Sequence, residues 1–125
     1  MKKLSHVFLM FTFMACLFAY GCAKKADSAK PIDQVQAEVQ KMSVSDLQSS
    51  AKAYADAIMS KRSDLEKIEQ QLKSINPTEI FSEKAKGIKD QLQTISSEVS
   101  ALTERYNIYA QKFQSMGGDV SKIKI

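Results

Sequence analysis

The side chains with the strongest intrinsic chemistry in this 125-residue chain are gathered near its N-terminus. The two cysteines are Cys16 and Cys22, and the single histidine is His6. A thiolate is a nucleophile and a metal ligand, and histidine is the usual general base near neutral pH. His6 and Cys16 lie inside residues 4–20, a run without Asp, Glu, Lys or Arg. A disulfide between Cys16 and Cys22 is therefore not expected.

The order of residues around this run is that of an export signal. Residues 1–3 carry two lysines, the uncharged run follows, and residues 23–28 are abruptly polar. An uncleaved membrane anchor is the alternative, but 17 residues lie at the lower limit for spanning a bilayer. We therefore predict that residues 1–21 are a signal peptide.

At Gly21 and Cys22 the chain resembles the lipobox of bacterial lipoproteins. In that family, signal peptidase II cuts before a cysteine whose sulfur carries a diacylglyceryl group. Gly21 and Cys22 match the pattern, Ala19 takes the aliphatic position, and Tyr20 departs from the usual small residue. The resemblance implies cleavage between Gly21 and Cys22, a diacylglyceryl group on Cys22, and in many bacteria an N-acyl chain as well. Two or more acyl chains give stable anchoring where one is marginal.

The same resemblance implies a place in the cell envelope, anchored to a membrane through lipid. In Gram-negative lipoproteins, an aspartate after the cysteine commonly retains the protein at the inner membrane. Ala23 stands there instead. We therefore expect the outer membrane if the protein is Gram-negative.

The mature chain offers little for catalysis. Removing the two lysines of the signal from 18 basic residues leaves 16 against 14 acidic ones. This balance lacks the basic stripe that nucleic-acid binding needs. The mature chain would also contain no histidine and no free thiol, and a two-helix hairpin offers no pocket of useful volume. We therefore predict a protein that is not an enzyme and uses no metal or cofactor beyond its covalent lipid.

After the cysteine, the sequence changes to polar residues and then to helical periodicity. Residues 22–31 are predicted to be the lipidated cysteine with a flexible tether, because no large apolar side chain follows Cys22 until Ile32. Apolar residues then recur at spacings of 3, 4 and 3, which predicts a short amphipathic helix over residues 32–42.

Two longer heptad patterns predict a pair of long helices, over about 44–75 and 77–116. Ser43 with Asp46 is a start signal for the first helix, and Asn76 with Glu79 is one for the second. The first apolar seam consists of Leu47, Ala51, Tyr54, Ile58, Lys61, Leu65, Ile68, Leu72 and Ile75. The second consists of Phe81, Ala85, Ile88, Leu92, Ile95, Val99, Leu102, Tyr106, Tyr109, Phe113 and Met116.

The fold class that follows is all-α. Because almost no loop separates the two long helices, they are expected to run antiparallel as a two-helix hairpin or coiled coil, with the short N-terminal helix as an addition. The hairpin domain covers residues 32–118 and ends at a glycine pair. The tail, residues 119–125, fits a short strand, a partner peptide or a frayed end, and a frayed end is the default expectation.

Four seam residues are candidates for contact with a partner: Lys61, Tyr106, Tyr109 and Phe113. Lys61 is the one charge in the seam, and the simpler explanation is that it bends past the seam toward Asp64 or Glu98. The simpler explanation for the aromatic residues is packing in the core. A separate stripe on the second helix has small residues at its centre and is either a contact for another hairpin or a plain surface: Ile80, Gly87, Thr94, Ala101 and Ile108.

These patterns favour a lipid-anchored helical rod that acts as a structural or scaffolding component of the envelope. The alternative is a specific partner-binding module, such as an inhibitor, an immunity-type lipoprotein or an accessory subunit, serving an unidentified envelope protein. The chain is also loosely similar to the murein lipoprotein family, whose members join peptidoglycan through a C-terminal lysine. Lys124 is penultimate here and Ile125 is last, so that linkage is not expected. Self-association is expected, because a single seam leaves much apolar surface uncovered.

Overall fold

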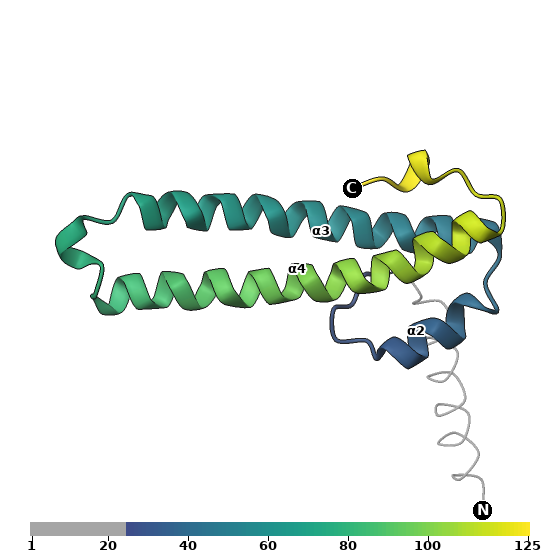
Figure 1. The fold of residues 1–125 in the computed structure, drawn as a ribbon, viewed down its shortest axis with the longest axis horizontal. Helices are drawn as coiled ribbons and strands as arrows, with labels where there is room; N and C mark the ends of the chain where they lie inside the picture. The colour runs from purple at the N-terminus through teal and green to yellow at the C-terminus, as the bar shows by residue number, and fades with distance from the viewer. Residues whose placement is uncertain (1–24) are drawn as a thin grey trace, which may run out of the picture.

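The computed structural model describes residues 25–125; the predicted signal peptide, Gly21 and Cys22 lie outside this range. Within it the chain forms helices and no strand (Figure 1). The elements are α2 (Ile32–Val39), α3 (Val44–Lys73), the 3-10 turn η1 (Pro77–Glu79), α4 (Glu83–Ser115) and the 3-10 turn η2 (Val120–Ile123). The prediction of an all-α hairpin with a short additional N-terminal helix is confirmed.

Helices α3 and α4 lie side by side for nearly their whole length (Figure 1). At 1.5 Å per residue, their 30 and 33 residues correspond to about 45 and 50 Å. None of the helices in residues 25–125 combines the length and the apolar character needed to cross a membrane.

The start of α3 is fixed by Ser43, as the sequence indicates. The backbone N–H of Asp46 donates to Ser43 Oγ at 3.2 Å, and the Ser43 hydroxyl donates to Asp46 Oδ2 at 2.8 Å. These bonds satisfy one of the helix's unpaired N–H groups and place a carboxylate in its first turn.

The predicted start of the second long helix at residue 77 is wrong. Residues 77–79 form only a 3-10 turn, and the side chain of Asn76 makes no capping hydrogen bond. Helix α4 begins six residues later, where Ser82 Oγ accepts from the N–H of Ala85 at 3.2 Å. The physical reason is distance: antiparallel helix axes lie 8–10 Å apart, and the irregular segment before Ser82 carries the chain across.

The end of α4 is a Schellman motif around the glycine pair. Gly117 has φ +85° and donates to Gln114 O, while Gly118 donates to Phe113 O at 2.9 Å. This left-handed residue ends the helix and sends the chain back along it, as glycine permits without strain.

Most of the core lies at the end of the hairpin away from the turn, which we call the head. There α2 packs along α4 on one side, and the C-terminal segment lies on the opposite side (Figure 1). The head therefore has more than two layers, and its buried cluster draws on every helix and on the tail. The cluster consists of Val35, Val39, Leu47, Ala51, Tyr54, Ala55, Ile58, Leu102, Tyr106, Tyr109, Phe113 and Ile123.

The rest of the hairpin, residues 59–98, is a two-helix arm that ends in the turn. Its buried apolar side chains are Ile68, Ala85 and Ile88. Other predicted seam residues, such as Leu65 and Leu92, are only half-buried. In the arm, each helix has only one partner helix, which covers only one stripe of its surface. Part of the arm's apolar surface therefore stays exposed, whereas in the head α2 and the C-terminal segment cover the long helices.

Two segments predicted to be loose are packed against the head. Residues 25–31, predicted to belong to the flexible tether, contact the core through Ala26 and are held by hydrogen bonds. The tail, expected to fray, buries Ile123 to 1% exposure, and the Tyr106 hydroxyl donates to Ile123 O at 2.7 Å. In both cases, side chains on the long helices supply partners that local sequence composition does not reveal.

Candidate functional site

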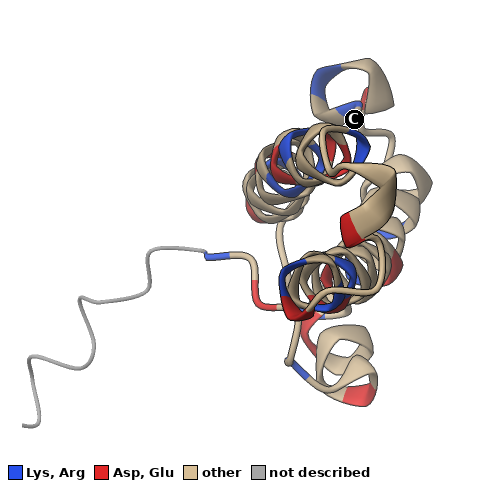
Figure 2. Cartoon of the chain, turned by 90° about the vertical axis from the view of Figure 1, so that its left-hand side faces the viewer, with Lys and Arg blue, Asp and Glu red and all other residues tan. Residues whose placement is uncertain are grey.

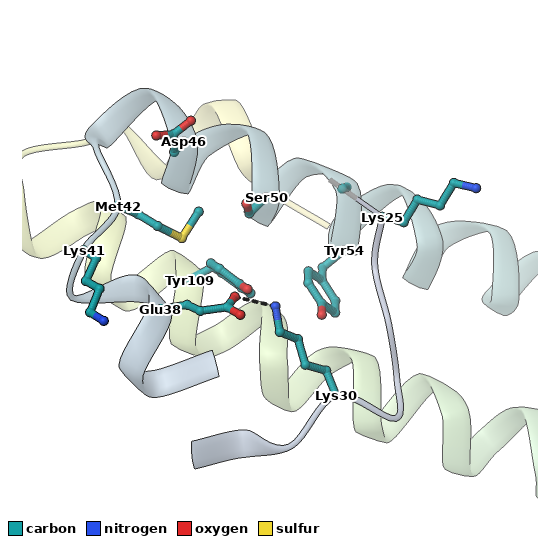
Figure 3. A pocket seen from close by; sticks show the side chains of 10 residues that line it. Lys25, Lys30, Glu38, Lys41, Met42, Asp46, Ser50, Tyr54 and Tyr109 are labelled. Carbon is teal, nitrogen blue, oxygen red and sulfur yellow. Dashed lines mark hydrogen bonds and ion pairs between the residues drawn. The ribbon is translucent and has the colours of Figure 1, made fainter. Parts of the chain in front are cut away.

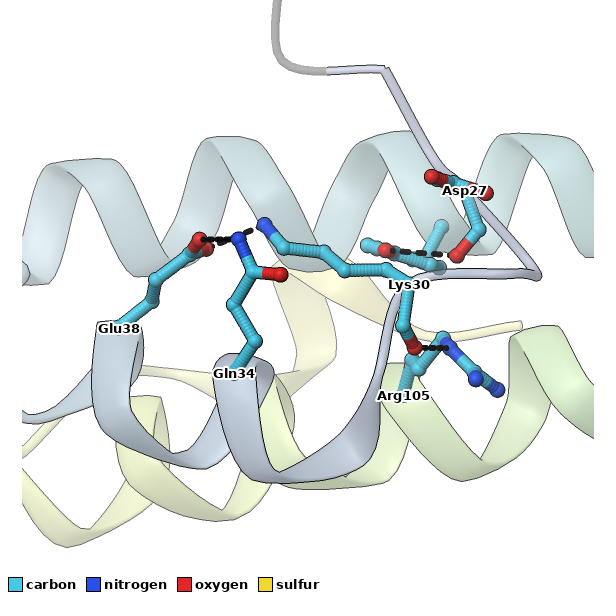
Figure 4. Close-up of polar contacts among 6 residues, drawn as sticks. Asp27, Lys30, Gln34, Glu38 and Arg105 are labelled. Atoms are coloured by element: carbon cyan, nitrogen blue, oxygen red, sulfur yellow. Dashed lines mark hydrogen bonds and ion pairs between the residues drawn. The ribbon is translucent and has the colours of Figure 1, made fainter.

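A short N-terminal segment, residues 25–31, crosses from α3 to α4 in the head; we call it the strap (Figure 4). The hydroxyl of Tyr54, on α3, donates to Asp27 O at 3.2 Å. The guanidinium of Arg105, on α4, donates through Nε to Lys30 O at 2.8 Å and through Nη1 to Ala101 O at 2.7 Å. Arg105 is only 8% exposed, so its charge is satisfied by carbonyl groups within the chain.

An ion pair joins the strap to α2: Lys30 Nζ donates to Glu38 Oε2, and Gln34 Nε2 donates to Glu38 Oε1 at 3.1 Å. The hydrogen bond from Lys30 lowers the pKa of Glu38 below its ordinary value. Burial is the largest single effect and acts to lower the pKa of Lys30, but the hydrogen bond to Glu38 and the nearby Tyr109, Glu38 and Tyr54 together outweigh it, and the pKa is raised.

These shifts set the pH range over which the ion pair stabilises the fold. A lowered carboxyl pKa contributes stability above the unfolded value of 4.5 and loses it as the pH falls through the folded value. A raised ammonium pKa contributes stability below 10.5 and loses it as the pH rises further. The pair therefore supports the docked strap throughout the neutral range and loses this effect in acid, where Glu38 is protonated, and in strong alkali, where Lys30 is deprotonated.

Beside the strap, α2, α3 and α4 enclose a pocket of about 560 Å³ (Figure 3). The expectation that the hairpin offers no pocket is wrong, because α2 and the strap add walls that two helices alone lack. Two stacked rings, Tyr54 and Tyr109, with centroids 5.3 Å apart, form part of the lining. The other lining residues are Lys25, Lys30, Glu38, Lys41, Met42, Asp46, Ser50 and Ala53.

The pocket combines aromatic and thioether surface with three lysines and two carboxylates. Burial raises the pKa of Tyr109 above its ordinary value of 10.0, so its hydroxyl stays protonated further into the alkaline range. In residues 25–125, no three His, Cys, Asp or Glu side chains are grouped as a metal site. The lining can therefore contact both charged and apolar groups of one ligand, as small-molecule binding sites do.

The sequence-predicted partner residues do not come together at this pocket. Lys61 lies in the arm and pairs with Glu98 at 2.6 Å, as its simpler explanation predicts, and this hydrogen bond raises the pKa of Lys61. Tyr106 and Phe113 are buried in the head, and only Tyr109 reaches the pocket. The burial of these aromatic residues favours core packing over an exposed aromatic patch.

The stripe of small residues on α4 has two different environments. A side chain at Gly87 would meet nothing within 4 Å, so packing within the chain does not explain this glycine. Farther along, Ala101 O accepts from Arg105, and Ile108 packs against the core. The head thus occupies the C-terminal end of the stripe.

Among residues 25–125, the most exposed large apolar residue lies at the turn of the hairpin, which we call the tip. Phe81 is 98% exposed and its neighbour Ile80 is 43% exposed. Seen from the tip, basic and acidic residues are mixed on the helices (Figure 2). The tip therefore presents its apolar residues on a surface without one dominant charge.

Comparisons with protein-family models, with curated proteins and with solved structures give no significant match.

Sequence reasoning missed Arg105, the strap and the exposure of Phe81. One signal was available for the arginine: residue 105 directly precedes the seam residue Tyr106, where a long cation can reach a neighbouring segment. No comparable signal marks the strap, because its backbone carbonyl groups are the atoms that bind.

Proposed function

We propose that this protein is a lipid-anchored envelope lipoprotein that acts as a scaffold, holding its tip at a fixed distance from the membrane. Cys22 carries the lipid, and the head is the end of the hairpin attached near the bilayer. The tip is the end that meets an envelope partner.

The observation that carries this proposal is the contrast between the two ends of the hairpin. At the head, the strap is bonded to both long helices through Tyr54 and Arg105. At the tip, Phe81 is almost fully exposed. From Tyr54 to Lys73 alone, α3 covers about 28 Å. A firmly attached near end and a far end where the neighbours Ile80 and Phe81 are both exposed suit a spacer, because contiguous exposed apolar residues mark contact sites.

Lipidation is tested by labelling cells with radioactive fatty acid. The wild-type protein and the Cys16→Ala variant should take up label, whereas Cys22→Ala should not. Equal labelling of wild type and Cys22→Ala would remove the lipoprotein proposal, and loss of label only in Cys16→Ala would move the site.

The alternative is a partner-binding module whose arm length is unimportant, and the exposure of Phe81 favours it equally. A photo-crosslinking amino acid at position 81 should capture the partner in intact cells, while one at the exposed Gln93 serves as control. Deleting residues 62–68 together with 88–94 removes one heptad from each helix and shortens the arm by about 10 Å. A spacer loses the capture at position 81 in this variant; a module that diffuses on its anchor keeps it.

A further inference from the structure

We propose that the pocket in the head binds a small organic anion with a flat apolar body, such as an aromatic monocarboxylate. The anionic group of the ligand accepts a hydrogen bond from Ser50, and its flat body packs against Tyr54 and Tyr109. The docked strap forms one wall of this site. The inference goes beyond the proposed scaffold and does not depend on the lipidation of Cys22.

The first argument is a buried hydroxyl group without a partner. Ser50 lines the pocket and is only 6% exposed. Within residues 25–125, its side chain makes no hydrogen bond. In the same part of the chain, no fully enclosed side-chain nitrogen or oxygen atom lacks a partner, so the Ser50 oxygen keeps surface that is open to the pocket. Buried hydroxyls are normally hydrogen-bonded, and this one has a donor available for an oxygen atom of a ligand.

The second argument is the apolar surface beside this hydroxyl. Ser50 and Tyr54 are four residues apart on α3, so they lie on one face of the helix, and Figure 3 shows both at the pocket. The Tyr54 ring stacks on Tyr109 of α4 with an interplanar angle of 26°, and Met42 adds its thioether to the lining. These side chains offer flat and adaptable apolar surface. The volume of about 560 Å³ is typical of sites for small organic ligands.

The third argument is the charge of the lining. Lys30 is paired with Glu38, and the Asp46 carboxylate lies in the same lining. Within residues 25–125, Lys25 and Lys41 form no ion pair. Three lysines and two carboxylates leave one excess positive charge, which favours a ligand with one negative charge. Because Lys25 and Lys41 are exposed, water and salt limit this preference to about fivefold in affinity.

The pocket is also coupled to the strap. Lys25 and Lys30 belong to the strap and line the pocket, and the Tyr54 hydroxyl donates to Asp27 O of the strap. A ligand that contacts this wall binds molecules with a docked strap in preference to open ones. By mass action, it lowers the open population by the factor 1 + [L]/Kd. Hydrogen exchange in the strap therefore measures binding.

The test titrates the full-length protein with 2-naphthoate, and in parallel with the neutral 2-naphthamide and the cationic 2-naphthylmethylammonium. Exchange is followed by mass spectrometry in the peptide that covers residues 25–31. Detergent is left out because it would compete for the apolar walls. The concentration of each probe that halves strap exchange equals its Kd.

We expect 2-naphthoate to slow exchange in the strap and to leave exchange in the arm unchanged. The neutral amide should need a concentration about fivefold higher, and the cation a higher one still.

Ser50→Ala should raise the Kd of 2-naphthoate about fivefold, as the loss of one hydrogen bond does. Its resistance to chemical denaturation should be at least that of the wild type, because alanine favours the helix and no partner within residues 25–125 is lost. Ser63→Ala, at an exposed position of α3 in the arm, is the matched control and should leave the Kd unchanged.

Other results overturn the inference in distinguishable ways. Strap exchange that 2-naphthoate does not slow up to its solubility limit removes the site. Equal potency of the amide and the carboxylate rejects an anionic ligand. An unchanged Kd in Ser50→Ala removes the serine from the site. Slower exchange in the arm together with the strap would show general stabilisation and would contradict binding in the head. None of these results bears on lipidation, which fatty-acid labelling tests separately.

Discussion

Replacing Arg105 by methionine should release the strap while leaving the hairpin folded. Methionine keeps an unbranched side chain in a position that is 8% exposed, but it removes the donor to Lys30 O at 2.8 Å. It also removes the donor to Ala101 O, a carbonyl within the same helix. Of these two hydrogen bonds, only the one to Lys30 O crosses to the strap.

The size of the effect follows from the charge of the donor. A hydrogen bond from a charged group contributes about 1.5–3 kcal/mol, about twice a neutral one. The remaining bond from Tyr54 to Asp27 O is neutral, and the Lys30–Glu38 pair is partly exposed. Losing the arginine should therefore raise the fraction of molecules with an open strap roughly 10- to 150-fold.

Hydrogen exchange measured by mass spectrometry on the intact protein reports this opening directly. Opening is read from the exchange of the peptide that covers residues 25–31, where the hydrogen bonds from Tyr54 and Arg105 end. Exchange in the arm should stay as in the wild type. Arg62→Met is the matched control, because it removes an exposed guanidinium from the arm.

Strap exchange within twofold of the wild-type rate in Arg105→Met would refute the assignment of Arg105 as the main anchor. Faster exchange in the strap and in the arm together would point to general destabilisation, and would equally contradict a local role. Faster strap exchange in Arg62→Met would show that the effect comes from charge alone.

Four further outcomes are expected. Gly118→Ala should destabilise the protein by about 1–3 kcal/mol in chemical denaturation, because its Cβ would overlap the ring of Phe113. Ile123→Ala should cost about 2–5 kcal/mol by the same measurement, and a smaller loss would mean that the tail contributes little to the core. As the pH falls below 4.5, protonation of Glu38 should free Lys30 and speed strap exchange; unchanged exchange in acid would contradict the role of the pair. Sedimentation across a concentration series should show self-association, and a mass that stays monomeric would remove that expectation.

The hairpin could be predicted because the residues that determine it lie close to one another in the sequence. Regular apolar spacing marks which face of each helix is buried, and Ser43 with Asp46 marks a start whose hydrogen bonds form within one turn. Lys61 was also interpretable, because the seam places Glu98 within reach. These features need only helix geometry and a neighbouring helix.

The strap, the tail and the tip were not predictable because they depend on contacts between distant parts of the chain. Arg105 binds a carbonyl group 75 residues away, and carbonyl groups carry no sequence signal. Ile123 is buried only because the Schellman turn returns the tail to the helices. At the tip, the sequence pattern indicated Asn76 as the cap, whereas the geometry of the reversal places the cap at Ser82.

The docking of the strap partway along the hairpin has a mechanical consequence. A pull on the chain at Lys25, directed away from the rod, acts first on the strap bonds and then on α2, one contact after another. The long helices receive the load only after residues 25–43 have been peeled away. That segment holds about 65 Å of extended chain. Residues 25–43 can thus act as an extensible link that yields under tension while the two long helices remain paired.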